Sequence, residues 1–388
     1  VTGRHSDRAR PLATPRRLHP VALRPRPHAA GEPWGSGSGK ALDEGDHMRI
    51  WLSTSGLALA VAAAPADAQM LMNGAGATFP YPIYSKWFDE YRKIHPDVQI
   101  NYQSIGSGGG VKQFTENTVD FGATDAPLTP EEVANAPGAV HIPETIGSVV
   151  PAYNIPEVPD SGLKFTGPVL ADIFLGKITK WNDPRLVELN PDANLPDENI
   201  IVVHRSDGSG TTYVWTDYLT AISPDWDQQV GKGKSVQWPT GIGAPGNEGV
   251  ANAIKGSPYT LGYVELAYAL TTGMPVGFVQ NQAGTFVEPT LVSTKAAVAA
   301  SAPTLPAGDG DWSNVTMVNA PGADSFPIAS FSYLLVDEDL SANPTMTEQK
   351  AKALVDFIDW AVTDGQQFAS DLGYVPLPEN VVQLNEQT

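Results

Sequence analysis

The chain has 388 residues, a formal net charge of −19 and no cysteine. The lack of cysteine excludes disulfide frameworks, thiolate zinc sites and cysteine nucleophiles, and the acidic balance argues against nucleic acid as a partner. The first 68 residues hold 9 of the 24 Lys and Arg but only 6 of the 43 Asp and Glu, so the remainder is more acidic still. Any anion bound by this chain must therefore be held by local dipoles, against the field of the whole molecule.

The first 47 residues are rich in Arg, Pro and Gly and show no helical or strand period. Such a composition indicates a segment that does not pack a core of its own. Two interpretations fit it: a basic arm that binds nucleic acid, or a vector remnant or mis-set translation start. We favour the second interpretation.

A secretory signal peptide is predicted over residues 48–68. Arg49 supplies a positive charge, Leu57–Ala64 is an apolar run, and Ala66–Ala68 has the small residues of a cleavage site before Gln69. The apolar run is too short to span a bilayer. We therefore expect a mature chain that starts near Gln69 and acts in the periplasm, without a lipid anchor because no cysteine stands at the cleavage site.

Strand-like and helical runs alternate along the rest of the chain, and this alternation indicates the α/β class. Apolar stripes at helical spacing predict helices, whereas alternating or continuous apolar runs predict strands. The predicted elements in chain order are a helix over 81–95, strands over 98–102, 119–123 and 200–203, a helix over 213–219 and a strand over 333–336.

A C-terminal helix is predicted after the last of these strands. The capping box Thr345–Glu348 opens it, and Gly365 ends it. Residues 302–311 are rich in Pro and Gly and are expected to form a loop. The apolar face of the C-terminal helix is expected to comprise Ala351, Leu354, Val355, Ile358 and Val362.

Three Gly-rich turns share one plan, in which a strand or extended segment is followed by small residues and then by a helix. They are Gly74–Pro80, Ile105–Gly110 and Arg205–Thr211. Glycine lets a backbone approach a ligand closely, and the free N–H groups and dipole of a helix's first turn attract negative charge. In an α/β sheet such turns gather at the carboxyl ends of strands. Most Gly-rich turns are only turns, but three with Ser or Thr at a helix start predict an anion site.

The arginines narrow the identity of the anion. After residue 68 the sequence contains only Arg92, Arg185 and Arg205. The first is predicted on a helix and the second in a Pro-rich loop, so both are expected to face solvent. Arg205 lies in a Gly-rich turn, where its guanidinium can hold two oxygens of a tetrahedral oxyanion. Asp207 is either the partner that orients Arg205 or an ordinary turn residue.

Asp125 indicates which oxyanion is bound. It follows the predicted strand over 119–123. A carboxylate in an anion site repels a fully ionised ligand and accepts a hydrogen bond only from a ligand that carries a proton. Phosphate near neutral pH carries one, and sulfate does not. The alternative is an Asx turn or helix cap ahead of Ala126 and Pro127.

With these residues in view, the chain resembles the phosphate-binding proteins of bacterial high-affinity phosphate ABC importers. The resemblance runs from about residue 72 to about residue 383, which is nearly all of the predicted mature chain. The similar sequence segments occur in the same order as in that family, which makes the resemblance specific. They are Asn73–Pro80, Gly106–Gln113, Thr118–Pro127 and Ser206–Thr211, with supporting similarity in Asp172–Trp181 and Leu261–Glu265.

The resemblance implies a two-lobed periplasmic binding protein with a ligand cleft between lobes joined by two hinge crossings. Lobe 1 would comprise residues 69–153 and 331–388, and lobe 2 residues 154–330. The expected partners are inorganic phosphate and the permease subunits of an ABC importer at the inner membrane, with the binding protein a monomer that needs no cofactor or metal. The implied phosphate ligands are Thr78, Phe79, Ser107 and Asp125 from lobe 1 and Arg205, Ser209, Gly210 and Thr211 from lobe 2, with Asp207 supporting Arg205.

Two other functions are weighed against this one. A phosphate-ester hydrolase or phosphoryl-transfer enzyme could use Ser209 as nucleophile, but Asp207 stands where a nucleophile elbow has glycine. His204 is the nearest candidate base and would alternate to the opposite side of the strand from Arg205. A structural or adhesive extracellular protein could retain the fold without binding phosphate. We expect a binding protein and not an enzyme.

Overall fold

The computed structural model describes residues 69–301 and 305–388. The predicted signal peptide and the segment before it lie outside the described residues. All of the described residues belong to one compact unit. No helix in the described ranges has both the length and the apolarity that a bilayer span requires.

A mixed eight-stranded sheet organises the described residues, with strand order β2-β1-β3-β11-β4-β8-β6-β7. A smaller sheet has the order β10-β9-β5. The α/β class predicted from sequence is confirmed. The strands are β1 Met70–Gly76, β2 Val98–Ser104, β3 Phe121–Thr124, β4 Ala139–Asn154, β5 Lys164–Phe165, β6 Ile201–Arg205, β7 Ile242–Ala244, β8 Thr260–Glu265, β9 Phe278–Gln280, β10 Phe286–Val287 and β11 Ala329–Asp337.

Helices pack beside these strands and carry many of the buried aromatic side chains, for example Trp87, Trp215 and Tyr218. Trp87 shows how they are fixed: its side chain is fully buried and its indole N–H donates to Gly365 O over 2.7 Å. The helices are α1 Tyr81–Ile94, α2 Ser107–Thr115, α3 Pro130–Asn135, α4 Gly167–Phe174, α5 Pro184–Leu189, α6 Gly210–Ile222, α7 Pro224–Gln229, α8 Gly246–Gly256, α9 Leu266–Thr272, α10 Leu291–Ser301, α11 Glu348–Val362 and α12 Glu379–Glu386. Single 3₁₀ turns follow at η2 Leu340–Ala342, η3 Asp364–Phe368 and η4 Ser370–Leu372.

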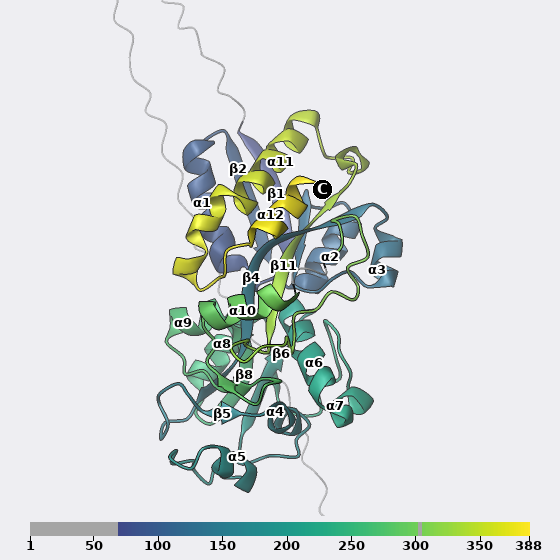
Figure 1. The fold of residues 1–388 in the computed structure, drawn as a ribbon. Coiled ribbons are helices and arrows are strands. Elements are labelled where there is room, and N and C mark those ends of the chain that lie inside the picture. The colour runs from purple at the N-terminus through teal and green to yellow at the C-terminus, as the bar shows by residue number, and fades with distance from the viewer. Residues whose placement is uncertain (1–68, 302–304) are drawn as a thin grey trace, which may run out of the picture. The chain divides into compact units, whose positions relative to one another are not determined.

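Strand β4 has a different neighbour along each part of its length. Its residues up to Ser148 pair antiparallel with β11, and its residues from Val149 onward pair antiparallel with β8. In Figure 1, β4 and β11 run between one group of elements that includes β1, β2 and α11 and another that includes β6, β8 and α6. Asn154 and Ser330, where hinge crossings are expected, lie at the end of β4 and near the start of β11.

The parallel strand pairs decide where the site can form. Strands β2 and β3 run parallel to β1, and β7 and β8 run parallel to β6. The carboxyl ends of parallel strands share one edge of a sheet, and the segments that leave them start helices there. α1, α2, α6 and α8 all begin within a few residues of such a strand end.

The C-terminal helix differs from its prediction in two ways. Thr347, not Thr345, is its N-cap and accepts from Lys350 N over 3.2 Å. The Thr345 hydroxyl bonds Asn343 Oδ1 instead, over 2.8 Å. The helix ends at Val362 and continues as the 3₁₀ turn η3, so Gly365 lies inside that turn and does not terminate the helix.

The predicted apolar face of α11 is confirmed at Leu354 and Val362, which are buried, and at Ile358, which packs against the core, but not at Val355. Val355 is 53% exposed, whereas Phe357, which was not assigned to the face, is buried. Phe357 packs edge-on against Tyr91 of α1, with ring centroids 5.2 Å apart. The residues of α11 that are buried are Ala353, Leu354, Phe357, Ala361 and Val362.

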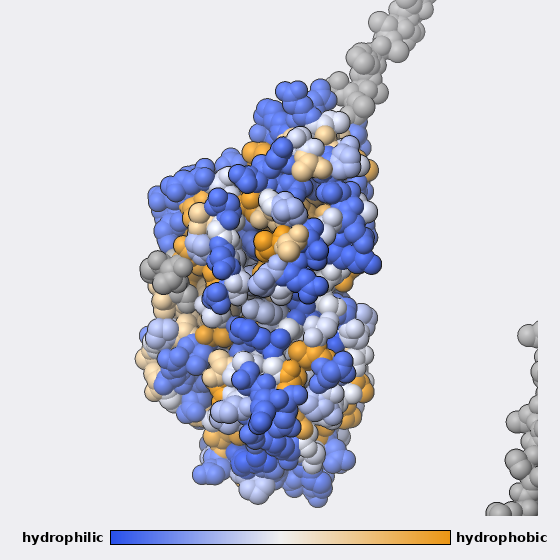
Figure 2. Space-filling model, turned by 90° about the vertical axis from the view of Figure 1, so that its right-hand side faces the viewer, coloured by the Kyte–Doolittle hydropathy of each residue, from blue (hydrophilic) through white to orange (hydrophobic). Residues whose placement is uncertain are grey.

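The surface is largely hydrophilic (Figure 2). Figure 2 shows hydrophilic residues over most of one face of the molecule, with smaller apolar areas between them. Arg185, expected to face solvent, is partly exposed and pairs with Asp172 and Asp183. Arg92 also lies on the surface, in the last turn of α1.

Candidate functional site

The starts of α1, α2 and α6 follow the Gly-rich turns that the sequence singled out. The second turn was placed before its helix, but α2 begins at Ser107 and includes Gly108, Gly109 and Gly110 in its first turn. Gly106, at φ 87°, takes the left-handed backbone conformation that turns the chain from β2 into this helix. The first N–H groups of these helices are donors without helical partners, as an anion site requires.

Ser107 links two of these helix starts. Its side chain is fully buried. The Ser107 Oγ atom accepts from Gly210 N over 3.0 Å, across 103 residues of sequence, and from Asp125 N over 3.2 Å. A Cβ atom on Gly210 would lie 2.5 Å from Ser107 Oγ and 2.6 Å from the Asp125 carboxylate. Only glycine therefore fits where α6 begins.

Thr78 and Thr211 are joined by Asn247, a residue that the sequence analysis did not select. Asn247 Nδ2 donates to Thr78 Oγ1 over 2.8 Å and to Thr211 Oγ1 over 3.0 Å. The Asn247 backbone N–H also donates to Thr78 Oγ1, over 3.1 Å. All three side chains are buried. Their hydroxyl and amide groups therefore form one connected network beneath the helix starts.

Arg205 lies at the end of β6 with its guanidinium almost wholly buried. Its Nε atom donates to Asp207 Oδ1 over 2.8 Å, and its Nη2 atom donates to Asp207 Oδ2. The remaining Nη1 atom lies 3.4 Å from Thr211 Oγ1. Burial alone would raise the pKa of Asp207, but the hydrogen bonds and charge of Arg205 outweigh burial and lower it. The ion pair thus fixes the orientation of the Arg205 guanidinium. Of the two alternatives for Asp207, the structure favours the partner of Arg205 over an ordinary turn residue.

Asp125 is the buried carboxyl group of the cluster, with 1% of its surface exposed. Its Oδ1 atom accepts from Ser332 Oγ over 3.0 Å, and its Oδ2 atom lies 3.5 Å from Thr211 Oγ1. Burial raises the pKa of Asp125 to about 7, against the lowering by the Ser332 hydrogen bond and the Arg205 charge. The group therefore changes charge near neutral pH.

Phe79, Ser209 and Gly210 occupy the first turns of α1 and α6 or the positions just before them. The Phe79 side chain lies in the core, and its carbonyl oxygen accepts from Tyr374 OH over 2.6 Å. Ser209 is the N-cap of α6: its Oγ atom accepts from Thr212 N over 3.0 Å. The Ser209 N–H donates to Lys234 O over 2.8 Å.

The contacts of Ser209 and His204 do not pair the two as nucleophile and base. The Ser209 hydroxyl serves as the helix cap, and the His204 ring stacks on Trp238 with centroids 4.7 Å apart. His204 Nδ1 contacts Arg205 O over 3.0 Å. Within residues 69–301 and 305–388 there is also no cluster of three His, Asp or Glu side chains that could hold a metal ion.

Three contributors to the cluster escaped the sequence analysis. Asn247 and Gly246 begin α8 directly after Gly241–Pro245, a fourth Gly-rich segment that includes β7, and the Gly246 N–H donates to Asp207 Oδ1 over 3.0 Å. That signal was present and could have been counted. Ser332 carries no such signal, because it lies within the strand β11 and reaches Asp125 only through strand pairing.

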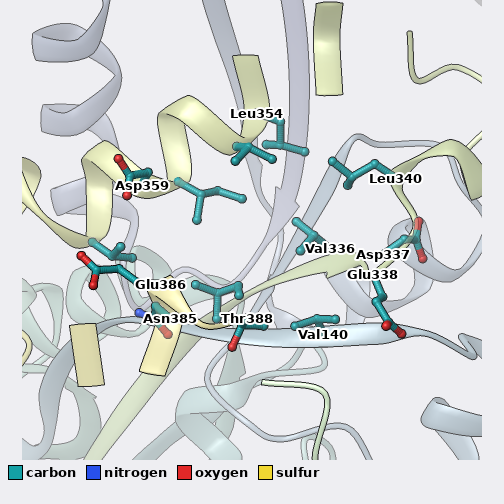
Figure 3. Close-up of a pocket in the computed structure, with 14 residues that line it drawn as sticks. Val140, Val336, Asp337, Glu338, Leu340, Leu354, Asp359, Asn385, Glu386 and Thr388 are labelled. Atoms are coloured by element: carbon teal, nitrogen blue, oxygen red, sulfur yellow. The ribbon is translucent and has the colours of Figure 1, made fainter. Parts of the chain in front are cut away.

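A pocket of about 280 Å³ lies elsewhere, between β4, β11, α11 and α12 (Figure 3). Its walls are largely apolar, for example Val140, Val336 and Leu354, and Asp337, Glu338 and Asp359 stand at its margin. None of the residues that line it belongs to the cluster around Asp125 and Arg205.

Comparisons with known proteins agree with one another. A family model described as PBP superfamily domain matches residues 60–364. The phosphate-binding protein PstS of Pasteurella multocida (strain Pm70) is 48% identical over 312 residues, which is 80% of this chain and 88% of that protein. PstS of Haemophilus influenzae is 49% identical over 311 residues, covering 80% of this chain and 90% of that protein.

Solved structures share the fold at lower identity. A high affinity periplasmic phosphate-binding protein (PfluDING) bound with phosphate has a TM-score of 0.63 and 20% identity, covering 82% of this chain and 92% of that one. A phosphate binding protein from Stenotrophomonas maltophilia has a TM-score of 0.60 and 20% identity, covering 81% and 92%. The fold of the chain is therefore the two-lobed fold of these binding proteins, as the sequence predicted.

Proposed function

This chain belongs to the phosphate-binding protein family of the PBP superfamily, and from that premise we propose that it binds inorganic phosphate in the periplasm and hands it to a membrane ABC importer. The relatives named phosphate-binding protein PstS support this function. The single observation that carries it is the meeting of Arg205 and Asp125 within one buried cluster at the helix starts.

We propose two sets of phosphate donors. The first set consists of the N–H groups of Thr78 and Phe79 with the hydroxyls of Thr78 and Ser107. The second set consists of the Arg205 guanidinium with Ser209, Gly210 and Thr211 at the start of α6. Helix dipoles and backbone N–H groups provide positive potential without a net positive charge, which suits a chain with a formal charge of −19.

Asp125 provides the selectivity of this proposal. As a carboxylate it accepts a hydrogen bond from the protonated oxygen of hydrogen phosphate, and it meets sulfate with an unpaired negative charge. An unpaired buried group costs about 1–3 kcal/mol, and more when it is charged. That difference is enough to reject sulfate by a factor of ten or more.

We further propose that residues 69–153 with 331–388 and residues 154–330 act as two lobes that close on the anion. Hydrogen bonds that join the two sets of residues support this: Ser107 Oγ to Gly210 N over 3.0 Å, and Gly108 N to Gly208 O over 2.8 Å. Ligand contacts that exist only after closure shift the population to the closed form. The binding protein acts as a monomer, and its lobe surfaces meet the permease.

Titration of the purified chain with phosphate and with sulfate tests the proposal. Tryptophan fluorescence is a suitable reporter because the chain has nine Trp. A micromolar site corresponds to about 8 kcal/mol of binding free energy. We expect saturable binding of phosphate, little response to sulfate, and a loss of at least about tenfold in affinity for Arg205→Ala. Absence of phosphate binding would contradict the function, and turnover of a phosphate ester above a protein-free blank would favour the enzyme instead.

A further inference from the structure

The pocket between β4, β11, α11 and α12 has an apolar interior. Its volume is about 280 Å³, and eight of the fourteen residues that line it are Val, Ile or Leu. Val355 is one of these and is 53% exposed, so the apolar surface of the pocket reaches solvent. Pockets that enclose a whole drug-sized ligand have volumes of about 300–1,000 Å³. This pocket therefore suits one or two apolar side chains better than a larger ligand.

The polar side chains of the pocket present mainly hydrogen-bond acceptors. Four of the six are carboxylates, and the other two are Asn385 and Thr388. Asn385 Nδ2 already donates to Pro143 O over 2.7 Å, and the Thr388 hydroxyl donates to Leu384 O over 2.9 Å. Asn385 Oδ1 is buried and has no hydrogen-bond partner among the described residues. An occupant of the pocket must therefore bring donors of its own.

The four carboxylates of the pocket form no ion pair within the part of the chain that the structure describes. The two lysines of α11 pair elsewhere: Lys350 Nζ lies 2.6 Å from Asp120 Oδ1, and Lys352 Nζ lies 2.7 Å from Asp356 Oδ2. The carboxylates also do not converge on one metal ion, because no three His, Asp or Glu side chains in residues 69–301 and 305–388 are grouped closely enough to hold one. A cationic occupant must therefore carry several positive charges that are spaced apart.

The carboxylates lie on two sides of the apolar interior. Figure 3 shows Asp359 and Glu386 on one side and Asp337 and Glu338 on the opposite side, with apolar side chains between them. Burial, followed by the charge of Asp339, raises the pKa of Asp337. A cation placed beside Asp337 would stabilise its ionised form. A complementary segment thus has an apolar side chain in its middle and a basic side chain on either side.

We propose that this pocket is a docking site for a basic segment of a partner protein, which inserts an apolar side chain between α11 and α12 and places Lys or Arg against the carboxylates on both sides. Charge complementarity selects this occupant. A second copy of this chain does not fit, because the formal net charge is −19 and the two acidic surfaces repel each other. The inference does not depend on the proposed phosphate binding, since no residue of the phosphate cluster lines the pocket.

Calorimetric titration of the chain with short synthetic peptides tests the proposal. The probe peptide has paired leucines at its centre and paired lysines at each end. We expect saturable binding that weakens as salt is added, because ion pairs at an exposed rim are screened. A peptide with serines in place of the leucines should bind at least about fivefold more weakly, since it has no apolar side chain to bury. A peptide with glutamates in place of the lysines should not bind.

Charge reversal at the pocket is compared with charge reversal elsewhere on the surface. Asp359→Lys and Glu386→Lys alter exposed residues, and each should lower the affinity for the lysine peptide by about tenfold, because like charges across an interface repel. Val355→Ser should lower it by about threefold, since it removes part of the apolar wall. Glu188→Lys is the matched control: this exposed glutamate of α5 lies outside the pocket, and its variant should bind the peptide as the unaltered chain does.

Four results would overturn the proposal. The first is an equal loss of affinity in Glu188→Lys and Asp359→Lys, because the peptide would then respond only to overall charge. The second is equal binding of the leucine and serine peptides, which remains measurable on the unaltered chain if a variant does not fold. The third is equal binding of a long-chain alkyl diamine, which would assign the pocket to a small organic cation. The fourth is a dimer in sedimentation of the chain alone that Val355→Ser dissociates, which would assign the pocket to a second copy.

Discussion

The Nζ atom of Lys234 lies 2.6 Å from Glu132 Oε2, although 102 residues separate them in sequence. Glu132 lies in α3, and Lys234 follows α7. Both side chains are largely buried, at 12% and 24% exposed. The carbonyl oxygen of Lys234 also accepts from the N–H of Ser209. This ion pair therefore joins the segment beside Asp125 to the segment that caps α6.

Lys234→Met is expected to weaken phosphate binding by about threefold to tenfold, because it removes a partly desolvated ion pair that joins the two proposed lobes. The loss should appear mainly as faster dissociation, measured by stopped-flow fluorescence. Lys352→Met is the control, since Lys352 pairs with Asp356 on the exposed side of α11. Equal dissociation rates for both variants would show that the Glu132 contact does not hold the closed form.

Asp125→Asn is expected to reduce the preference for phosphate over sulfate. An amide can donate a hydrogen bond as well as accept one, so the position no longer distinguishes a protonated oxyanion from an ionised one. Competition titrations with both anions measure the ratio of affinities. An unchanged ratio would mean that selectivity comes from the backbone donors alone.

Selectivity should also depend on pH in the unaltered chain. Because burial raises the pKa of Asp125 to about 7, the carboxyl group is ionised above this value and protonated below it. The protonated form can donate to sulfate. The preference for phosphate should thus decline from about pH 8 to about pH 5, by up to about tenfold per pH unit. Asp125→Asn should show no such trend, and an equal trend in both proteins would contradict the assignment.

Asn247→Ala is expected to lower phosphate affinity by about fivefold or more. The change removes the amide that joins Thr78 to Thr211 and leaves buried hydroxyls with fewer partners, at a cost of about 1–3 kcal/mol. Calorimetry measures the affinity, and thermal unfolding measures the accompanying loss of stability. Asn101→Ala, at an exposed position of β2, should change neither quantity. Retained affinity with reduced stability would limit Asn247 to a structural role.

The fold was largely predictable from local patterns. The aromatic stripe of α1 and the alternation in β2 follow the periods of helix and strand, which depend only on residues near in sequence. The cap of α11 was placed two residues early because two threonines, Thr345 and Thr347, both suit a helix start. The burial of Phe357 against Tyr91 of α1 depends on tertiary packing, which a local pattern does not show.

The candidate site likewise combines features that are local in the sequence with contacts between residues far apart in it. Gly-rich turns, one buried arginine and one aspartate after a strand are local features, so the sequence by itself predicted an anion site and the residues that lead into it. The partners that set their chemistry are not local: Asn247 reaches Thr78 over 169 residues, and Ser332 reaches Asp125 over 207. Burial and the pairing of distant strands set the environment of Asp125, because desolvation exists only after the chain has folded around it.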